Sequence, residues 1–179
     1  MKTQLHISKQ PKIFGKNSTW GRLALCAVTF TLVFILGAKV LGTRYGIYAD
    51  GRIYKCMPYT LFILDKWHRK GEAGNYYAFS AKNTRMFKNG EVLAKQFVAG
   101  FNDVVEIDDN EIIKVNQNVV ERGLNLAAKM GREREDFMGK AVIEKDDFYA
   151  LGSTRDSFDS RYWGTVNEKQ IIGQLHPVF

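Results

Sequence analysis

Cysteine, proline and histidine are scarce in this chain, which has two, three and three of them among 179 residues. Cys26 lies inside the longest apolar run and Cys56 lies beyond it, so the two are not expected to form a disulfide. His6, His68 and His176 are scattered, and no cysteine cluster accompanies them, which argues against a zinc motif. The sequence also lacks internal repeats and a glycine-rich phosphate loop. We therefore expect neither a metal nor a cofactor.

Acidic residues are absent from the first 22 positions, so most of the formal net charge of +7 lies in this N-terminal segment. The cations of this segment are Lys2, Lys9, Lys12, Lys16 and Arg22. They leave a net charge of only +2 for residues 23–179. Such a small excess gives no basic footprint for phosphates, so a nucleic-acid partner is not expected.

Charged residues are also missing from Leu23 to Ala38. With Val40, Leu41 and a flanking Lys39 that can extend to the membrane surface, the run reaches roughly the 17–20 residues that span a bilayer. The sequence therefore predicts one transmembrane helix.

The cations before the run set its expected orientation. The positive-inside bias places residues 1–22 in the cytoplasm, a single-pass anchor at 23–41 in the inner (cytoplasmic) membrane, and residues 43–179 in the periplasm or another extracytoplasmic space. A cleaved signal peptide is the alternative. The apolar run is longer than a usual signal-peptide core and no clear small-x-small site follows it, which favours an uncleaved anchor.

Beyond the anchor, the sequence predicts a mainly β domain. One hairpin is expected to join residues 45–48 to 52–54 through the Asp50-Gly51 turn, and another to join 104–107 to 112–115 through a polar loop. Further strands are expected at 61–64, 75–80, 92–100, 141–144, 148–151 and 171–177.

Two segments of this domain show no strand pattern. Residues 117–140 are charged and lack periodicity, which predicts a solvated insertion with one short helix at 124–130. Residues 152–164 are rich in hydrogen-bonding side chains, and loops of this kind are often functional when a β scaffold holds them. An ordinary surface loop with Asx and Ser turns is the alternative.

The turn Tyr54-Lys55-Cys56-Met57-Pro58 follows the anchor closely. Proline fixes its own φ and favours an extended conformation in the residue before it, which suits the presentation of a side chain at position 56. A lone cysteine near a proline is more often a small buried apolar residue than a catalyst, so this turn needs support from elsewhere in the sequence.

That support comes from three segments that together resemble the type I signal peptidases. Cys56-Met57-Pro58 resembles the Ser-Met-Pro box just outside their anchor. Residues 95–100 followed by 103–107 are similar to their lysine strand and hairpin, and residues 157–164 to their Ser-x-Asp-Ser-Arg-Tyr-x-Gly box. The three segments occur in the family's order over residues 52–173.

The small size, the charged insertion before residues 148–152 and the ending at 171–175 look more like the TraF peptidases of conjugative plasmid transfer. The resemblance implies a signal-peptidase-like β domain on one N-terminal transmembrane helix. It also implies a serine–lysine dyad that cuts, or in some relatives cyclises, exported pilin precursors.

Residue by residue, the resemblance implies a catalytic group. Cys56 matches the nucleophilic serine and Lys95 the general base. Ser157 and Asp159 match the residues that orient and support the lysine, and Arg161 matches an arginine that braces the loop.

The sequence departs from the family pattern at several positions. The nucleophile is cysteine rather than serine, and whether this thiol is native to the site or replaces a serine stays open. Tyr54 stands where many relatives have the hydroxyl residue of the oxyanion hole, which leaves the Cys56 amide as the expected oxyanion donor. Thr60 replaces a glycine that TraF sequences often have.

Lys95 is expected to be buried, because it lies between Val92, Leu93, Phe97 and Val98. A lysine acts as a base only when it is neutral, and burial among apolar side chains favours the neutral form.

Two forms of the chemistry are then available. A neutral amine could remove the proton of the nucleophile, or Cys56 and Lys95 could form a thiolate–ammonium pair. The alternative is structural, with Lys95 a buried cation paired to Asp159.

The function predicted from the sequence is the processing of an exported pilin or other signal-bearing precursor beside the membrane. Met57, Pro58 and Tyr59, with Leu61 and Phe62, are expected to offer apolar surface for substrate and for the lipid interface.

Two functions other than processing are also considered for this sequence. The main alternative is a non-catalytic relative that binds precursor or pilus-assembly proteins. A self-cleaving repressor with the same dyad is disfavoured, because residues 1–40 contain an anchor and no DNA-binding domain.

Overall fold

The computed structural model describes residues 19–50 and 56–179. The chain divides into two compact units, Met1–Gly42 and Thr43–Phe179. Helix α1 (Thr19–Arg44) is the described part of the first unit and ends two residues inside the second. All of the β-strands of the described residues belong to the second unit.

Helix α1 is long and apolar enough to cross a membrane. Its 26 residues give a length of about 39 Å at 1.5 Å per residue, more than the roughly 30 Å of a bilayer core. The Thr29 and Thr31 hydroxyls donate to the carbonyls of Leu25 and Ala27 at 2.9 and 2.8 Å, so the helix satisfies its own polar side chains. The helix begins four residues before the expected anchor and ends three residues after it.

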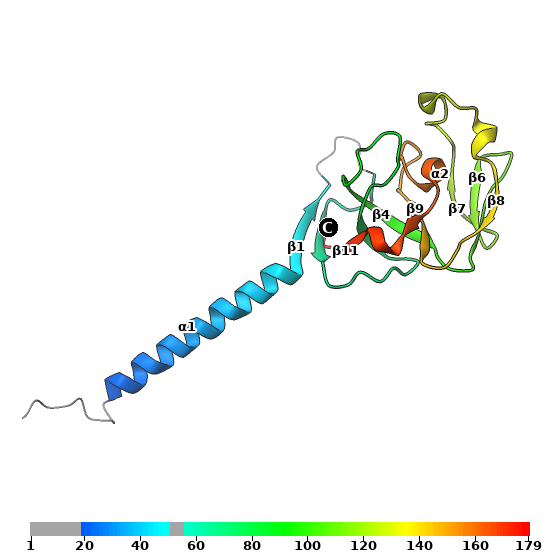
Figure 1. Ribbon diagram of the computed structural model, residues 1–179. Coiled ribbons are helices and arrows are strands. Elements are labelled where there is room, and N and C mark those ends of the chain that lie inside the picture. Colours follow the sequence, from blue (N-terminus) through cyan, green and yellow to red (C-terminus); the bar gives the residue numbers. More distant parts are fainter. Residues whose placement is uncertain (1–18, 51–55) are drawn as a thin grey trace, which may run out of the picture. The chain divides into compact units, whose positions relative to one another are not determined.

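The second unit consists of two antiparallel sheets, which confirms the mainly β prediction (Figure 1). The larger sheet has the order β1-β2-β11-β3-β4-β9-β10 and the smaller one the order β7-β6-β5-β8. The strands of the larger sheet are β1 (Tyr45–Ala49), β2 (Leu61–Asp65), β3 (Tyr76–Ser80), β4 (Val92–Ala99), β9 (Asp147–Leu151), β10 (Val166–Asn167) and β11 (Ile171–Pro177). Those of the smaller sheet are β5 (Val104–Ile107), β6 (Ile112–Val115), β7 (Asn118–Arg122) and β8 (Gly139–Val142).

The hairpin expected at 104–107 and 112–115 is confirmed, with Ile107 opposite Ile113. In its loop, the Asp108 carboxylate accepts hydrogen bonds from Lys114 and from the backbone, and these lower the pKa of Asp108 below its ordinary value. The other expected hairpin involved residues 52–54, which lie outside the described residues. Within the described chain, β1 pairs with β2.

Most of residues 117–140 are exposed, as expected for a solvated insertion, but the prediction that this segment lacks strands and has a helix at 124–130 is wrong. Strands β7 and β8 add to the smaller sheet, and single 3₁₀ turns occur at Ala128–Met130 and Arg134–Phe137 in place of the expected helix. Leu124, Leu126, Ala127 and Met130 are buried. Leu124, Leu126 and Met130 belong to one cluster with Tyr149, Phe158 and Tyr162. Their spacing has no regular period, so the local sequence pattern could not show this packing.

Arg44 and Asp65 fix the start of the second unit to strand β2. The Arg44 Nη2 atom lies 2.7 Å from Asp65 Oδ2, and the Lys66 amide donates to the Arg44 carbonyl at 2.9 Å. The hydrogen bonds from Arg44 lower the pKa of the Asp65 carboxyl, although its burial acts in the opposite direction. Arg44 is thereby held on strand β2 of the larger sheet.

Candidate active site

Lys95 projects from β4, near the middle of the larger sheet. It lies opposite Tyr77 of β3 and is only 4% exposed. Leu93 and Phe97 point to the same side of the strand as Lys95, because side chains alternate between the faces of a sheet. The ordinary strand pattern of β4 therefore carries an amine into an apolar environment, which disfavours its charged form.

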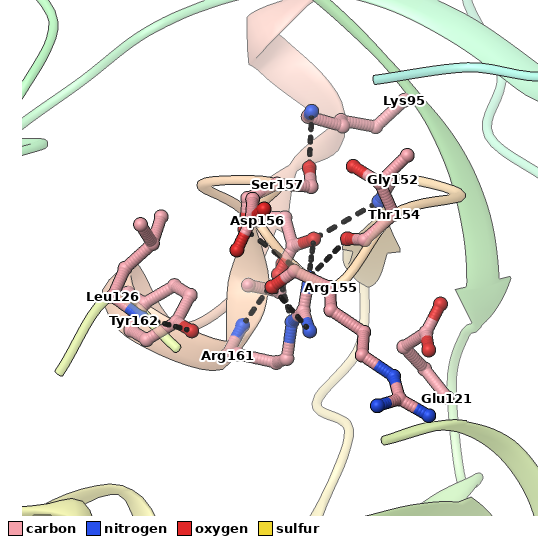
Figure 2. Close-up of polar contacts among 12 residues, drawn as sticks. Lys95, Glu121, Leu126, Gly152, Thr154, Arg155, Asp156, Ser157, Arg161 and Tyr162 are labelled. Atoms are coloured by element: carbon pink, nitrogen blue, oxygen red, sulfur yellow. Dashed lines mark hydrogen bonds and ion pairs between the residues drawn. The ribbon is translucent and has the colours of Figure 1, made fainter. Parts of the chain in front are cut away.

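Ser157 holds the amine of this lysine. The Lys95 Nζ atom donates to Ser157 Oγ at 2.6 Å, and the serine is fully buried (Figure 2). Ser157 belongs to the loop between β9 and the short helix α2 (Ser160–Trp163). The pairing of Lys95 with Ser157 was expected from the family resemblance, and the two residues lie 62 positions apart in the chain.

Gly152 allows this loop to pack tightly against position 56. A Cβ atom at Gly152 would lie 2.1 Å from Ser157 Oγ and 2.8 Å from the Cys56 carbonyl oxygen. The neighbouring Ser153 amide donates to that carbonyl at 2.8 Å. Only glycine leaves room for this approach, so the end of β9 fixes both Ser157 and the backbone of Cys56.

Asp159 does not pair with Lys95, contrary to one of the sequence interpretations. Its carboxylate accepts two side-chain hydrogen bonds from Arg161, each at 2.8 Å, and one from the Gly152 amide at 3.0 Å. Both charged side chains of this pair are fully buried. Asp159 therefore acts on Lys95 only through the loop that carries Ser157.

Arg161 donates hydrogen bonds to several backbone carbonyls, most of them in that loop. It donates to Thr154 O and Ser157 O at 3.0 and 3.1 Å, and to Gly123 O at 3.0 Å (Figure 2). Burial alone would lower the pKa of Arg161, but its hydrogen bonds with Asp159 outweigh burial and raise it. The bracing role expected for Arg161 has a direct geometric basis here.

Residues 123–126 of the insertion brace the same loop, which the sequence reasoning missed. Besides the Gly123 carbonyl, Asn125 Nδ2 donates to Asp156 Oδ1 at 2.9 Å, and the Leu126 amide donates to the Tyr162 hydroxyl at 3.1 Å. Figure 2 shows Leu126 beside Tyr162 on one side of the Arg161 network. No local sequence signal marks these contacts, because the partners are more than 30 positions away.

Cys56 is partly buried and lines the same small hollow as Lys95. The hollow measures about 10 Å³, at or below the space that one water molecule needs. Tyr48, Leu93 and Ala94 form other parts of its wall. The structure thus brings the expected nucleophile and the expected base to one site.

The amide expected to serve as oxyanion donor has a partner in this structure. Cys56 N donates to Asp50 Oδ2 over a long distance of 3.4 Å, and Asp50 is 7% exposed. From the sequence, Asp50 was expected only to be a turn residue. A carboxylate at this amide has to give way before the amide can bind a substrate oxygen.

The three residues expected to contact substrate differ in exposure. Met57 is 2% exposed and packs in a cluster with Phe62, Ala78, Ala94 and Leu175, so neither Met57 nor Phe62 offers the surface that was expected.

Pro58 and Tyr59 are exposed and adjoin Cys56 in the chain, so their side chains are accessible to a substrate.

Within residues 19–50 and 56–179, no group of three or more His, Cys, Asp or Glu side chains is placed to hold a metal ion.

The comparison with known families agrees with this arrangement. A family profile described as "Signal peptidase, peptidase S26" matches residues 22–179, most of the chain. The chain belongs to this family. Membership of the S26 family agrees with the resemblance in the three sequence segments. The family match does not distinguish the TraF subtype from other S26 peptidases.

Two relatives illustrate the range of similarity. A signal peptidase I of Buchnera aphidicola subsp. Baizongia pistaciae (strain Bp) is 47% identical over 38 residues, which are 21% of this chain and 12% of that protein. The chain thus covers only a small part of the length of this curated relative. The crystal structure of a signal peptidase I from Enterococcus faecalis V583 is similar with a TM-score of 0.39 and 20% identity, over 60% of this chain and 97% of that one.

Proposed function

We propose that this S26 family protein is a membrane-anchored endopeptidase in which Cys56 is the nucleophile and Lys95 the general base. The observation that carries the proposal is the position of Lys95. This residue is buried, its amine donates to Ser157, and it lines the same hollow as Cys56. The carboxylate of Asp159 is paired with Arg161, so it does not compete with Ser157 for the amine.

The chemistry follows from these groups. Lys95 takes the thiol proton of Cys56, and the sulfur attacks the carbonyl carbon of the scissile bond. The Lys95 ammonium then returns the proton to the leaving amine, and a thioester remains on Cys56. Attack by water gives a linear product, whereas attack by an amine of the bound chain gives a cyclic one.

The proposed substrate is an exported pilin or another signal-bearing precursor, as in the TraF peptidases that this sequence resembles. The apolar helix α1 supports a site beside a membrane, where the apolar leader of an exported protein also resides. Pilus-assembly proteins are proposed partners because the sequence resembles the TraF peptidases.

The proposed topology has residues 1–22 in the cytoplasm and residues 43–179 outside the inner membrane. Alkaline phosphatase fused after Phe179 is expected to be active, because this reporter folds only outside the cytoplasm, and the same reporter fused after Arg22 is expected to be inactive. An inactive fusion at Phe179 with normal expression would contradict both the topology and a role in export.

The nature of position 56 is tested by Cys56→Ser and Cys56→Ala in cells that also make a pilin precursor, with the precursor mass as readout. We expect the wild type to remove a leader peptide and Cys56→Ala to leave the precursor intact. A cyclic product needs a further cut at the C-terminal side of the mature chain, whose thioester on Cys56 is attacked by the chain's own N-terminal amine; its mass is one water below that of the linear product. If the thiol is native, Cys56→Ser should slow processing strongly, on the order of 100-fold, because a serine hydroxyl is a weaker nucleophile at neutral pH. A gain of similar size would identify a serine site with a substituted thiol.

A non-catalytic function is the second candidate, and one observation favours it. The Cys56 amide faces the Asp50 carboxylate, and the hollow between Cys56 and Lys95 is very small. Intact precursor with wild type and with Cys56→Ser, together with co-purification of that precursor, would support a binding protein instead of an enzyme.

A further inference from the structure

A second and much larger cavity lies between the smaller sheet and the segment around α2. It measures about 670 Å³, within the range of ligand-binding pockets. Its walls come from strands β5 and β8, from residues 130–138 of the insertion and from residues 160–165. Cys56 and Lys95 are not among its lining residues, so this cavity is distinct from the candidate active site.

The inner wall of the cavity is apolar and buried. It is formed by side chains of the core cluster that joins the two sheets, namely Val105, Ile107, Met130, Ile143, Tyr149 and Tyr162. Trp163 lies at the same wall and is partly buried. This surface suits an aliphatic or aromatic side chain.

Tyr149 adds one polar group to this apolar wall. The residue is 7% exposed and lines the cavity. Its hydroxyl can donate to or accept from a ligand in the cavity.

The charges at the cavity are balanced except at Arg85. Arg132 pairs with Asp136 at 3.2 Å, and Lys140 with Glu106 at 3.6 Å.

The buried Arg161 is likewise balanced by Asp159. Arg85 donates to the Met130 carbonyl and has no carboxylate at ion-pair distance within the described chain. Arginine has five donors in a fork that fits a carboxylate, so the cavity is complementary to a ligand with one negative charge.

Strand β8 gives the cavity a backbone edge. It is the last strand of the smaller sheet, and among the described residues it pairs only with β5. Its four residues are exposed, and Gly139, Lys140 and Ala141 line the cavity. An exposed strand edge can pair with an extended peptide, whereas a fatty acid has no groups for such pairing.

We propose that this cavity binds the carboxyl-terminal residues of an extended peptide that ends in an apolar residue. The peptide backbone adds to the edge of β8, its last side chain fills the apolar wall, and its terminal carboxylate binds Arg85 with the Tyr149 hydroxyl as an additional partner. The inference does not depend on whether Cys56 and Lys95 are catalytic.

The test uses the full chain in detergent micelles and a six-residue peptide, Gly-Thr-Thr-Val-Thr-Leu, labelled with a fluorophore at its N-terminus. Two forms differ only at the C-terminus, one with a free carboxylate and one with an amide, so that partition into the micelle is matched. Fluorescence anisotropy is expected to show that the carboxylate form binds about tenfold or more tightly, because a charge-assisted hydrogen bond is lost in the amide.

Arg85→Gln is expected to abolish the difference between the two peptides, whereas the control Arg122→Gln should preserve it, because Arg122 is exposed on β7 and does not line the cavity. Tyr149→Phe is expected to weaken both forms by a few fold without removing the difference. Backbone amides of residues 139–142 should exchange more slowly with bound peptide. Thermal unfolding of each variant shows that the fold is retained.

Three results would overturn the inference. The two peptides could bind equally well to the wild type, or neither could bind at 1 mM. Decanoate could instead bind with the same dependence on Arg85 and cause no slowing of exchange in β8, which would assign the cavity to a fatty acid.

Discussion

The variant Lys95→Met is expected to fold and to process no detectable precursor. General-base catalysis contributes about 10²–10⁴-fold to a rate, and Lys95 is the buried amine at the hollow that Cys56 lines. Methionine has a similar length and fits among Leu93 and Phe97, so the apolar packing of β4 should persist. The mass of a co-expressed precursor measures the loss.

The stability of this variant is a second readout. Ser157 loses its partner, which costs about 1–3 kcal/mol, but the cost of burying an amine disappears at the same time. We therefore expect a small net change in the free energy of unfolding. Lys82→Met, at an exposed position, is the matched control and should process normally. Normal processing by Lys95→Met would assign Lys95 to the core alone.

The variant Arg161→Met is expected to be the most destabilised. It would leave the Asp159 carboxylate buried without its partner and would remove the donor to the carbonyls of Thr154, Ser157 and Gly123. Breaking a buried ion pair by removal of one partner costs about 3–5 kcal/mol, a large part of the stability of a typical domain. Urea unfolding of the purified chain measures this loss.

Two controls separate the buried pair from ordinary surface charge. Arg132→Met breaks the Arg132–Asp136 pair, whose side chains are 45% and 47% exposed, and should cost less than about 1 kcal/mol. The double variant Arg161→Met, Asp159→Leu removes both buried charges and should recover part of the lost stability. A loss below about 1 kcal/mol for Arg161→Met, or no recovery in the double variant, would contradict the role given to this pair.

The sequence by itself determined the elements whose signals are local. The uncharged run after residue 22 predicted α1, the alternation around Asp108 predicted the β5–β6 hairpin, and an apolar strand with one amine predicted the buried Lys95. Three short segments also indicated the S26 family, which the match over residues 22–179 shows. Each of these signals depends on neighbours along the chain, where periodicity and the lack of charge have a direct physical meaning.

Tertiary structure alone decided which polar groups meet. Asp159 is two residues from Arg161 and binds it, whereas Lys95 donates to Ser157, although the sequence allowed either an acidic or a hydroxyl partner for the lysine. The Cys56 amide donates to the Asp50 carboxylate, a contact that the sequence did not indicate.

The insertion shows the same limit, because its charged residues gave no sign that Leu124, Leu126 and Met130 are buried in one cluster with Tyr162. Partners that are far apart in the sequence are selected by how closely two backbones approach, as the contact of Gly152 with Cys56 illustrates. That approach is a property of the packed sheets and cannot be read from any single stretch of the sequence.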